Sequence, residues 1–231
     1  MMAKHIGIVA CSAEGAALCY QTICKEGSAI MGPHAHPEVS MHTHPLSEYM
    51  EHIYRDDWKG VARLMLSSSK KLQAAGADFL ISPDNTIHQS MEEVKKQSPL
   101  PWLHIAEEVA REAKRNKYSK SFILGTKYLM TGPVYTETFD QFQLEYKIPD
   151  EPAREKIDAI IFDELVYGDI NHDSKKYFLE QIMKARDSGC NSVVLGCTEI
   201  PLIVLPDESP LPVLDSTRLL ARAALRFALS A

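Results

Sequence analysis

The chain has 231 residues, of which 45% are apolar and 24% are charged, and its formal net charge is -6 at pH 7. This composition supplies a sizeable hydrophobic core, and the length allows one large domain or two smaller ones. The mildly acidic chain lacks a basic stripe and any run near the ~18 apolar residues of a membrane span, so we expect neither nucleic acid nor a membrane as a partner. The apolar stretch after Lys4 begins as a buried strand, which favours a core element over a signal peptide.

The cysteines indicate a reduced protein. There are five of them, an odd number, and none forms a C-x-x-C pair: Cys11, Cys19, Cys24, Cys190 and Cys197. A disulfide scaffold or a structural zinc site is therefore not expected. We expect a cytoplasmic protein, and we also expect it to form a homodimer.

The first part of the chain alternates short apolar runs with longer helical patterns. The predicted strands cover 5–9, 38–43 and 77–81. Helices are predicted from the small residues after the first strand to about Cys24, and over about 47–75. The turn-rich segment 82–86 is then expected to open another helix.

The segment Ser98-Pro99-Leu100-Pro101 interrupts this pattern and predicts a crossing between two lobes. Beyond it, helices are expected at 106–116, from Pro133 onward, and at 151–167, 173–188 and 217–229. Strands are expected at 122–124, 144–147, 193–195 and 212–214.

Strands that alternate with helices of this length indicate parallel βαβ units. The predicted fold is therefore α/β. The division that we expect is 1–99 plus 212–231 for an N-terminal lobe and 100–211 for a C-terminal lobe. In parallel sheets ligands bind at the carboxyl ends of the strands, so the loops at those ends are the candidate site.

Two strand-end loops are similar to each other. One runs from Phe79 through Asp84-Asn85-Thr86 to His88, and the other is Val193 to Pro201 with Gly196-Cys197-Thr198-Glu199 at its centre. Each is a buried strand followed by a titratable residue and small polar residues, which can bind a carboxylate. The plain alternatives are a helix cap for the first loop and a buried core thiol for Cys197.

These motifs resemble the aspartate/glutamate racemase superfamily of cofactor-independent amino-acid racemases. Gly196-Cys197-Thr198-Glu199 is similar to the second cysteine motif of the family, and Asn85-Thr86-Ile87-His88 to the tail of the first. Further segments match in order along nearly the whole chain: Ile6-Gly7-Ile8, Leu124-Gly125-Thr126, Thr131 and Leu214-Asp215-Ser216-Thr217.

The resemblance implies two similar α/β lobes, each a mainly parallel sheet flanked by helices, with the active site in the cleft between them. It implies an isomerase that needs neither pyridoxal phosphate nor a metal. In the two-base mechanism of the family, a thiolate removes the Cα proton from one face and a thiol protonates the other. Proton transfer of this kind needs hydrogen-bond reach and a suitable pKa.

The chain departs from the family at the first catalytic position, where Asp84 replaces cysteine. We interpret Cys197 and Asp84 as the catalytic pair, with a helix cap as the alternative role of Asp84. A carboxylate is a weak base unless its pKa is raised by burial or by a nearby negative charge. The loop after the first strand also departs from the family, since Cys11 and Ser12 stand in place of a Gly-Gly-Met segment. Either side chain could line the pocket. We expect Cys11 to be a bystander and not a replacement base.

The remaining candidates are substrate contacts: Ser12, Thr43, His44, Asn85, Thr86, Thr126, Thr131, Thr198 and Glu199. Among them Asn85, Thr86, Thr126 and Thr198 are expected to bind the α-carboxylate and amino group. The histidine-rich stretch from His34 to His44 could instead bind a metal, because alternate residues of a strand share a face; the resemblance favours a place at the pocket mouth. The segment 168–171 stands where acid-specific members are expected to carry a basic residue, which puts a preference for aspartate or glutamate in doubt.

Two rival functions remain open. Some members of the superfamily keep only the second cysteine and decarboxylate malonates, and others isomerise maleate. Because this chain has Asp84 in place of the first cysteine, the alternative is a decarboxylase or a cis-trans isomerase that acts on a dicarboxylate. The third possibility is a non-catalytic binding protein with an eroded site. The retained Gly196-Cys197-Thr198-Glu199 loop argues against erosion.

Overall fold

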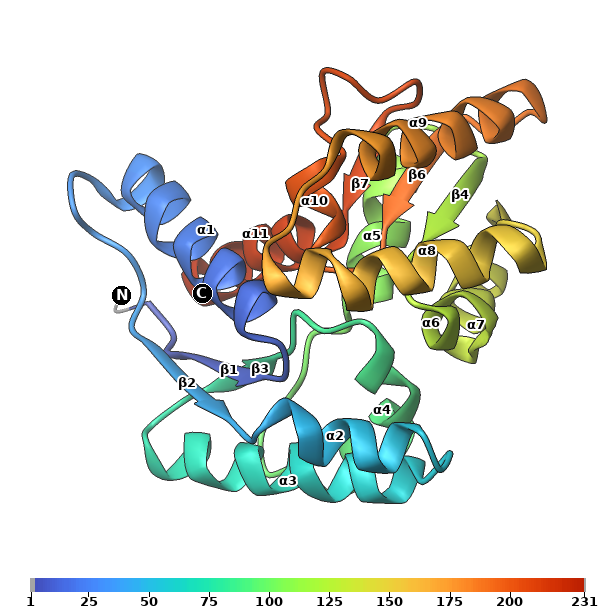
Figure 1. The fold of residues 1–231 in the computed structure, drawn as a ribbon. Coiled ribbons are helices and arrows are strands. Elements are labelled where there is room, and N and C mark those ends of the chain that lie inside the picture. Colours follow the sequence, from blue (N-terminus) through green and yellow to red (C-terminus); the bar gives the residue numbers. More distant parts are fainter. Residues whose placement is uncertain (1–2, 231) are drawn as a thin grey trace. The chain divides into compact units, whose positions relative to one another are not determined.

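The computed structural model describes residues 3–230 and divides into two compact units. The first unit takes the chain up to Ile105 and from Thr217 onward, and the second is Ala106–Ser216. Each unit has its own parallel sheet with helices packed on it (Figure 1). The predicted α/β class with two parallel sheets is therefore confirmed.

The sheet of the first unit has three parallel strands in the order β2-β1-β3. These are β1 (Ile6–Ala10), β2 (Val39–Thr43) and β3 (Phe79–Ile81). The central strand β1 is buried along its whole length, as expected for a strand with neighbours on both edges and helices on its faces. At Gly7 a Cβ atom would lie 2.6 Å from the end of the Leu80 side chain and 3.0 Å from Cβ of Ala77, so β1 and the segment that leads into β3 pack closely here.

Six helices accompany this sheet: α1 (Ala13–Met31), α2 (Leu46–Ile53), α3 (Trp58–Ala74), the 3-10 helix η1 (Thr86–Ser90), α4 (Met91–Gln97) and α11 (Ser216–Leu229). Helices α1 and α11 pack apolar residues against β1 and β3, in a core that includes Ile8, Ile23, Phe79 and Leu220. Helix α1 is longer than predicted and ends only at Gly32, whose φ of 107° is left-handed.

The single helix predicted over 47–75 is wrong, because two helices, α2 and α3, occupy this segment. Asp56 between them has a φ of 52°, which no helix continues. Asp57 then caps α3 by accepting a hydrogen bond of 2.9 Å from the Gly60 N–H, and its other oxygen bonds to Nδ1 of His52 at 2.9 Å. The apolar periodicity continues through the break, so periodicity alone did not reveal it.

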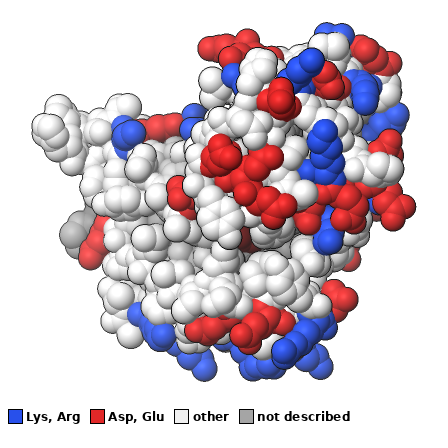
Figure 2. All heavy atoms as spheres, viewed as in Figure 1, with Lys and Arg blue, Asp and Glu red and all other residues white. Residues whose placement is uncertain are grey.

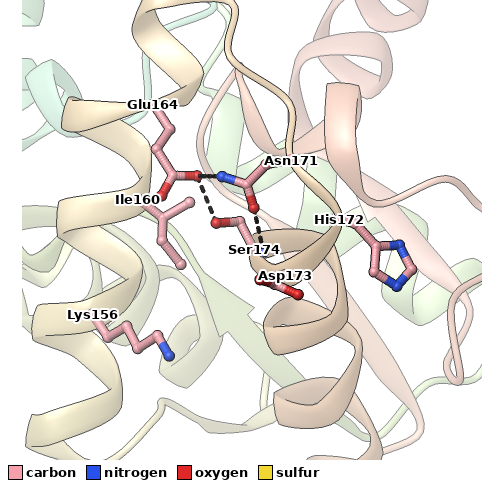
Figure 3. A pocket seen from close by; sticks show the side chains of 7 residues that line it. All are labelled: Lys156, Ile160, Glu164, Asn171, His172, Asp173 and Ser174. Carbon is pink, nitrogen blue, oxygen red and sulfur yellow. Dashed lines mark hydrogen bonds between the residues drawn. The ribbon is translucent and has the colours of Figure 1, made fainter.

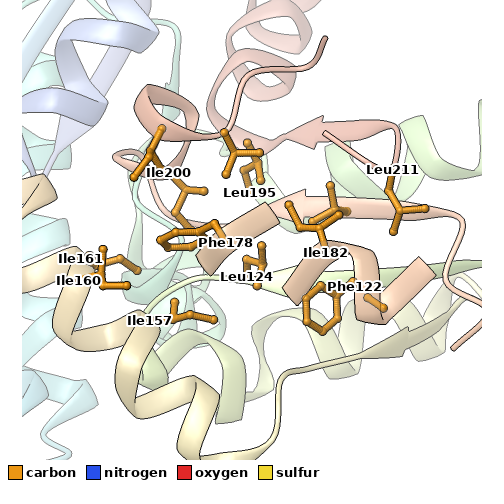
Figure 4. Close-up of a cluster of buried hydrophobic side chains, with 14 of the residues drawn as sticks. Phe122, Leu124, Ile157, Ile160, Ile161, Phe178, Ile182, Leu195, Ile200 and Leu211 are labelled. Carbon is orange, nitrogen blue, oxygen red and sulfur yellow. The ribbon is translucent and has the colours of Figure 1, made fainter. Parts of the chain in front are cut away.

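The sheet of the second unit has four parallel strands in the order β5-β4-β6-β7. They are β4 (Lys120–Leu124), β5 (Glu145–Lys147), β6 (Ser192–Leu195) and β7 (Val213–Asp215). Its helices are α5 (Ile105–Arg115), α6 (Lys127–Thr131), α7 (Pro133–Gln141), α8 (Glu151–Asp163), η2 (Leu165–Tyr167), α9 (His172–Asp187) and α10 (Ile200–Ile203). Figure 4 shows the core that α8 and α9 form on one face of β4 and β6, with Phe178 and Ile182 at its centre.

The boundaries of the two units differ from the predicted division, 1–99 plus 212–231 and 100–211, whose outermost residues 1, 2 and 231 lie outside the described part of the chain. Strand β7 pairs with β6, from Val193↔Val213 to Leu195↔Asp215, so 213–215 belong to the second sheet. The residues up to Ile105 stay with the first unit. The short helices α6 and α10 were not predicted, since each is too short for a helical period to show.

The surface carries mixed charge. On the face seen in Figure 2, acidic and basic side chains are interspersed. Ion pairs of the second unit include Lys175–Glu208 and Lys127–Glu155. Within residues 3–230 no helix is both long and apolar enough to cross a membrane.

The cap at Asp57 predicts a pH-dependent stability difference. The Gly60 N–H, followed by His52 and Arg63, lowers the pKa of this carboxyl in the folded protein, so its stabilisation is present above the unfolded pKa and is lost as pH falls through the folded one. Asp57→Asn keeps a capping oxygen without the charge. In urea titrations, wild type should be the more stable at pH 7, and the difference should shrink steadily between pH 5 and 3. A constant difference would contradict this account.

Candidate active site

The Gly196–Cys197 loop begins directly at the end of β6. The Gly196 N–H donates to the carbonyl of Leu124 on β4 at 2.7 Å. A Cβ atom at position 196 would clash with the side chain of Leu129 and lie 2.9 Å from that same carbonyl oxygen. Since no side chain fits at 196, the first side chain beyond the strand is the thiol of Cys197.

The thiol of Cys197 is partly exposed and has a buried carboxylate beside it. Its Sγ donates to Oε2 of Glu199 at 2.9 Å, and Thr198 Oγ1 donates to the same oxygen at 2.8 Å. Glu199 and Thr198 are each only 4% exposed. A carboxylate held in this way can accept the thiol proton and leave a thiolate nucleophile or base. Sequence reasoning assigned Glu199 to the substrate and missed this contact, although Cys-x-Glu in one short loop was its signal.

Thr126 lies next to this loop because β4 and β6 pair at Leu124↔Leu195. A Cβ at Gly125 would come within 3.3 Å of the Gly196 carbonyl oxygen. Thr126 caps α6, since its Oγ1 accepts from the Leu129 N–H at 3.3 Å. Thr131 is exposed at the other end of α6, and its hydroxyl donates to the carbonyl of Lys127 at 2.8 Å. The structure thus brings Thr126 and Cys197 together at one sheet edge.

Two buried hydroxyls support the end of β6 from behind. Ser216 Oγ donates to the carbonyl of Leu195 at 2.8 Å. Burial raises the pKa of Tyr135, whose phenol hydrogen bonds to Ser216. The carbonyl just before the Gly196–Cys197 loop is therefore fixed by buried groups, which restricts the movement of the loop.

Asp84 lies in the loop between β3 and η1 of the first unit. Its Oδ1 accepts from the Ile87 N–H at 3.3 Å, which is a helix-capping contact. The side chain is partly exposed, as is that of Thr86, whereas Asn85 is only 3% exposed. The capping contact uses Oδ1, one of the two carboxylate oxygens of Asp84.

His88 holds the backbone of this loop. Its Nε2 accepts from the Ile105 N–H at 3.4 Å, which places the ring proton on Nδ1, 3.3 Å from the carbonyl oxygen of Asp84. Burial lowers the pKa of His88 well below its usual range, and His104 lowers it further. A neutral imidazole therefore anchors the Asp84 carbonyl, a role that sequence reasoning did not assign.

The other candidates in the first unit lie at the ends of β1 and β2. Ser12 caps α1 by accepting from the Gly15 N–H at 3.3 Å. Cys11 is buried at 4% exposure, and its charge and that of Asp84 both raise the pKa of Tyr49. Thr43 is exposed and donates to the carbonyl of His44, whose Nε2 lies 3.2 Å from Ser67 Oγ.

The histidine stretch does not form a set of metal ligands in the structure. Across the described residues, no three histidine, cysteine, aspartate or glutamate side chains converge as such a set. His42 instead bonds to Ser68 and Lys71, both at 2.9 Å.

A cavity of about 440 Å³ lies between α8 and the start of α9 (Figure 3). Glu164 crosses one side of it, accepting from Asn171 Nδ2 at 2.6 Å and Ser174 Oγ at 2.5 Å. Lys156 is the basic side chain in its lining. The lining contains none of the predicted catalytic or substrate-binding residues.

Comparison with known proteins agrees with this architecture. The family model described as Asp/Glu/Hydantoin racemase matches residues 6–224. The broad specificity amino-acid racemase RacX of Bacillus subtilis is 23% identical over 192 residues, which are 82% of this chain and 81% of RacX.

Two solved structures are similar over almost the full length of both chains. A Yersinia pestis protein provisionally named an Asp/Glu racemase has a TM-score of 0.90 at 29% identity, and the match covers 98% of this chain and 100% of that one. An aspartate racemase homologue from Pyrococcus horikoshii has a TM-score of 0.86 at 28% identity, with the same coverage. The superfamily predicted from the motifs is confirmed, and the chain belongs to the Asp/Glu/hydantoin racemase family.

Proposed function

We propose that the protein is a cofactor-independent amino-acid racemase in which Cys197 is one catalytic acid/base. The observation that carries this proposal is the hydrogen bond of 2.9 Å from the Cys197 thiol to the buried carboxylate of Glu199. Transfer of the thiol proton to Glu199 leaves a thiolate that can remove the substrate Cα proton. Thr198, which donates to the same carboxylate, holds it in place for that transfer.

Asp84 is proposed as the second acid/base. Inversion at Cα requires one group that removes a proton and another that returns one to the opposite face. The two units supply one candidate each, the carboxyl of Asp84 in the first and the thiol of Cys197 in the second. Asn85, Thr86, Thr126 and Thr198 follow or neighbour these groups, and we propose that they bind the α-carboxylate and amino group. Roles for Ser12, Thr43, His44 and Thr131 remain predictions.

The compartment, substrate class and oligomeric state of the protein are proposed separately. All five cysteines are free thiols, which supports a reducing compartment and hence the cytoplasm. A small amino acid as substrate follows from the family. Homodimer formation and the proposed absence of a cofactor stay predictions from the sequence.

The test of the function is α-proton exchange. The protein is incubated in D₂O with a panel of L-amino acids, and loss of the α-proton signal is followed together with the appearance of the D-enantiomer. Exchange with inversion supports the racemase. Decarboxylation of a malonate without exchange would support the decarboxylase, for which the carboxylate at position 84 is the specific argument. Inactivity in both assays would indicate a binding protein.

Cys197→Ala should abolish racemisation without unfolding the protein. Removal of an acid/base typically costs ~10²–10⁴ in rate, whereas a partly exposed thiol at a strand end contributes little packing. Cys24→Ala on α1 is the matched control, since Cys24 is also a partly exposed thiol. Racemisation rates and circular dichroism of both variants check this. A folded Cys197→Ala protein with wild-type kcat would exclude the mechanism.

Glu199→Gln should slow catalysis and leave the fold intact. The amide keeps an oxygen that can accept a hydrogen bond, but it cannot take the thiol proton, so we expect kcat to fall by about 10²-fold. Thr198→Val should have a smaller effect, because it removes only the second bond to the carboxylate. The rate of thiol alkylation at Cys197, measured against Cys24, should fall in Glu199→Gln. An unchanged alkylation rate would show that Glu199 does not act on the thiol.

Asp84→Asn should stop inversion while Cys197 still exchanges the α-proton of one enantiomer with solvent. In the wild type, the two directions start from different groups, so kcat should differ between the enantiomers. The two kcat/KM values must nevertheless be equal, because free enantiomers have equal free energy. Asp84→Cys should bring the two kcat values together. If Asp84→Asn racemises like wild type, its carboxylate is only the cap of η1.

A further inference from the structure

The cavity between α8 and the start of α9 contains none of the residues used in the proposed reaction. Its volume of about 440 Å³ is in the range of small-molecule sites. All of its lining residues belong to the second unit, so the cavity is complete within that unit. Its polar lining consists of Lys156, Glu164, Asn171, His172, Asp173 and Ser174.

Three of the lining residues form a row along α8. Lys156, Ile160 and Glu164 follow one another at intervals of four residues, which places them on one face of the helix. The Glu164 N–H still donates to the Ile160 carbonyl at 3.1 Å, so the row continues past the last residue of α8. Eight residues of helix rise by ~12 Å. The row therefore presents an ammonium, an apolar side chain and a carboxylate in this order (Figure 3).

The carboxylate at one end of the row is held in a fixed orientation. Its Oε2 accepts from Asn171 Nδ2 at 2.6 Å and from Ser174 Oγ at 2.5 Å. Asn171 is fixed in turn, because its Oδ1 accepts from the Ser174 N–H at 2.8 Å and caps α9. Figure 3 shows the other oxygen of Glu164 pointing back along α8, towards Ile160. Among residues 3–230 both donors to this carboxylate are neutral, so no neighbouring cation compensates its charge.

The ammonium at the other end of the row is also without a counter-charge. The Nζ atom of Lys156 lies 4.0 Å from the ring centroid of Tyr177 on α9. This cation–π contact orients the side chain but leaves its charge in place. In the described part of the chain Lys156 forms no ion pair. The row thus carries two opposite charges that are not paired with each other or with any other side chain.

The start of α9 adds negative charge at the Glu164 end. Asp173 lies in the first turn of α9 and lines the cavity beside Ser174, which bonds to Glu164. Two carboxylates at one end of a cavity attract a cation. An ammonium group fits them best, because it is compact and carries three hydrogen-bond donors and no acceptor.

We propose that this cavity binds a small chain-like molecule with an ammonium group at one end and a carboxylate at the other, which is an ω-amino acid. Its ammonium donates to the outer oxygen of Glu164 and is attracted by Asp173. Its methylene groups pack on Ile160, and its carboxylate pairs with Lys156. Basic amino acids contain the same series of groups. The proposal does not rest on racemisation, because binding requires no chemical step.

The probe that tests the proposal is 6-aminohexanoate. It has no chiral carbon and cannot be racemised, so its binding is measured separately from activity. Isothermal titration calorimetry gives the Kd, and amide chemical shifts of α8 and the start of α9 locate the probe. Hexanoate and hexylamine each lack one charged end, and we expect each to bind about tenfold or more weakly than the probe. Added salt should weaken binding of the probe, because both contacts are between charges.

Glu164→Gln and Lys156→Met remove one charge each. The glutamine keeps an oxygen for the two neutral donors, and the methionine keeps most of the length of the lysine. Each variant should bind 6-aminohexanoate about tenfold or more weakly than wild type, with an unchanged melting temperature. Glu180→Gln and Lys176→Met on α9 are the matched controls, since both side chains are exposed and lie outside the cavity lining. Both controls should bind the probe like wild type.

Saturable binding that both cavity variants weaken and neither control weakens supports the site. The absence of saturation at concentrations well above a Kd of ~1 mM would overturn it. Equal affinity for 6-aminohexanoate and hexylamine would overturn the two-ended ligand. Undiminished affinity in either cavity variant would show that the probe binds elsewhere. If Glu164→Gln unfolds, Lys156→Met at the exposed end decides the result.

The proposed function is tested independently of this site. A protein that binds 6-aminohexanoate in the cavity but racemises no amino acid of the panel would overturn the proposed function and leave the site standing. A racemising protein that does not bind the probe would have the opposite meaning.

Discussion

The close approach of β4 and β6 at Gly125 and Gly196 is the constraint on which the second unit depends. Leu129 packs over both glycines; a Cβ atom at Gly196 would also lie 2.9 Å from the backbone oxygen of Leu124, and one at Gly125 would lie 3.3 Å from the carbonyl oxygen of Gly196. Since no side chain can intervene, the chain passes from a buried strand to the Cys197 thiol within two residues. Parallel strands place their carboxyl ends at one edge, which is why Thr126 lies beside the thiol although it is 71 residues away in the sequence.

The sequence predicted those parts of the structure that a few consecutive residues determine. Buried parallel strands read as apolar runs, so β1, β3, β4 and β6 were located within a few residues. The Gly196-Cys197-Thr198-Glu199 loop was singled out because an unusual combination of residues follows a strand. The break between α2 and α3 was missed because it depends on a left-handed Asp56 and on the pairing of His52 with Asp57, neither of which alters the apolar pattern.

Contacts between distant segments could not be predicted from one sequence. The imidazole of His88 fixes the Asp84 carbonyl only because Ile105 determines its tautomer. The pKa of Tyr49 on α2 depends on residues that are distant in the sequence. Burial and the charges of Cys11 and Asp84 raise this pKa, and the hydroxyl of Ser68 on α3 lowers it. A tyrosine in an amphipathic helix is an ordinary core residue in sequence terms, and only the surroundings of its oxygen distinguish it. Such features require the tertiary structure, because the partners come from separate elements.

The two candidate acid/base groups differ in how their protons are handled. Cys197 has a proton acceptor within its own loop, because its thiol donates a hydrogen bond to the carboxylate of Glu199. The thiol proton therefore has a nearby group to which it can move. Asp84 is itself a carboxylate, and one of its oxygens is already used to cap η1. A carboxylate that must alternate between acid and base needs a supply of protons more than it needs an acceptor. In the proposed mechanism, the substitution of a carboxyl for a thiol at position 84 therefore changes the requirement on the first unit from proton removal to proton delivery.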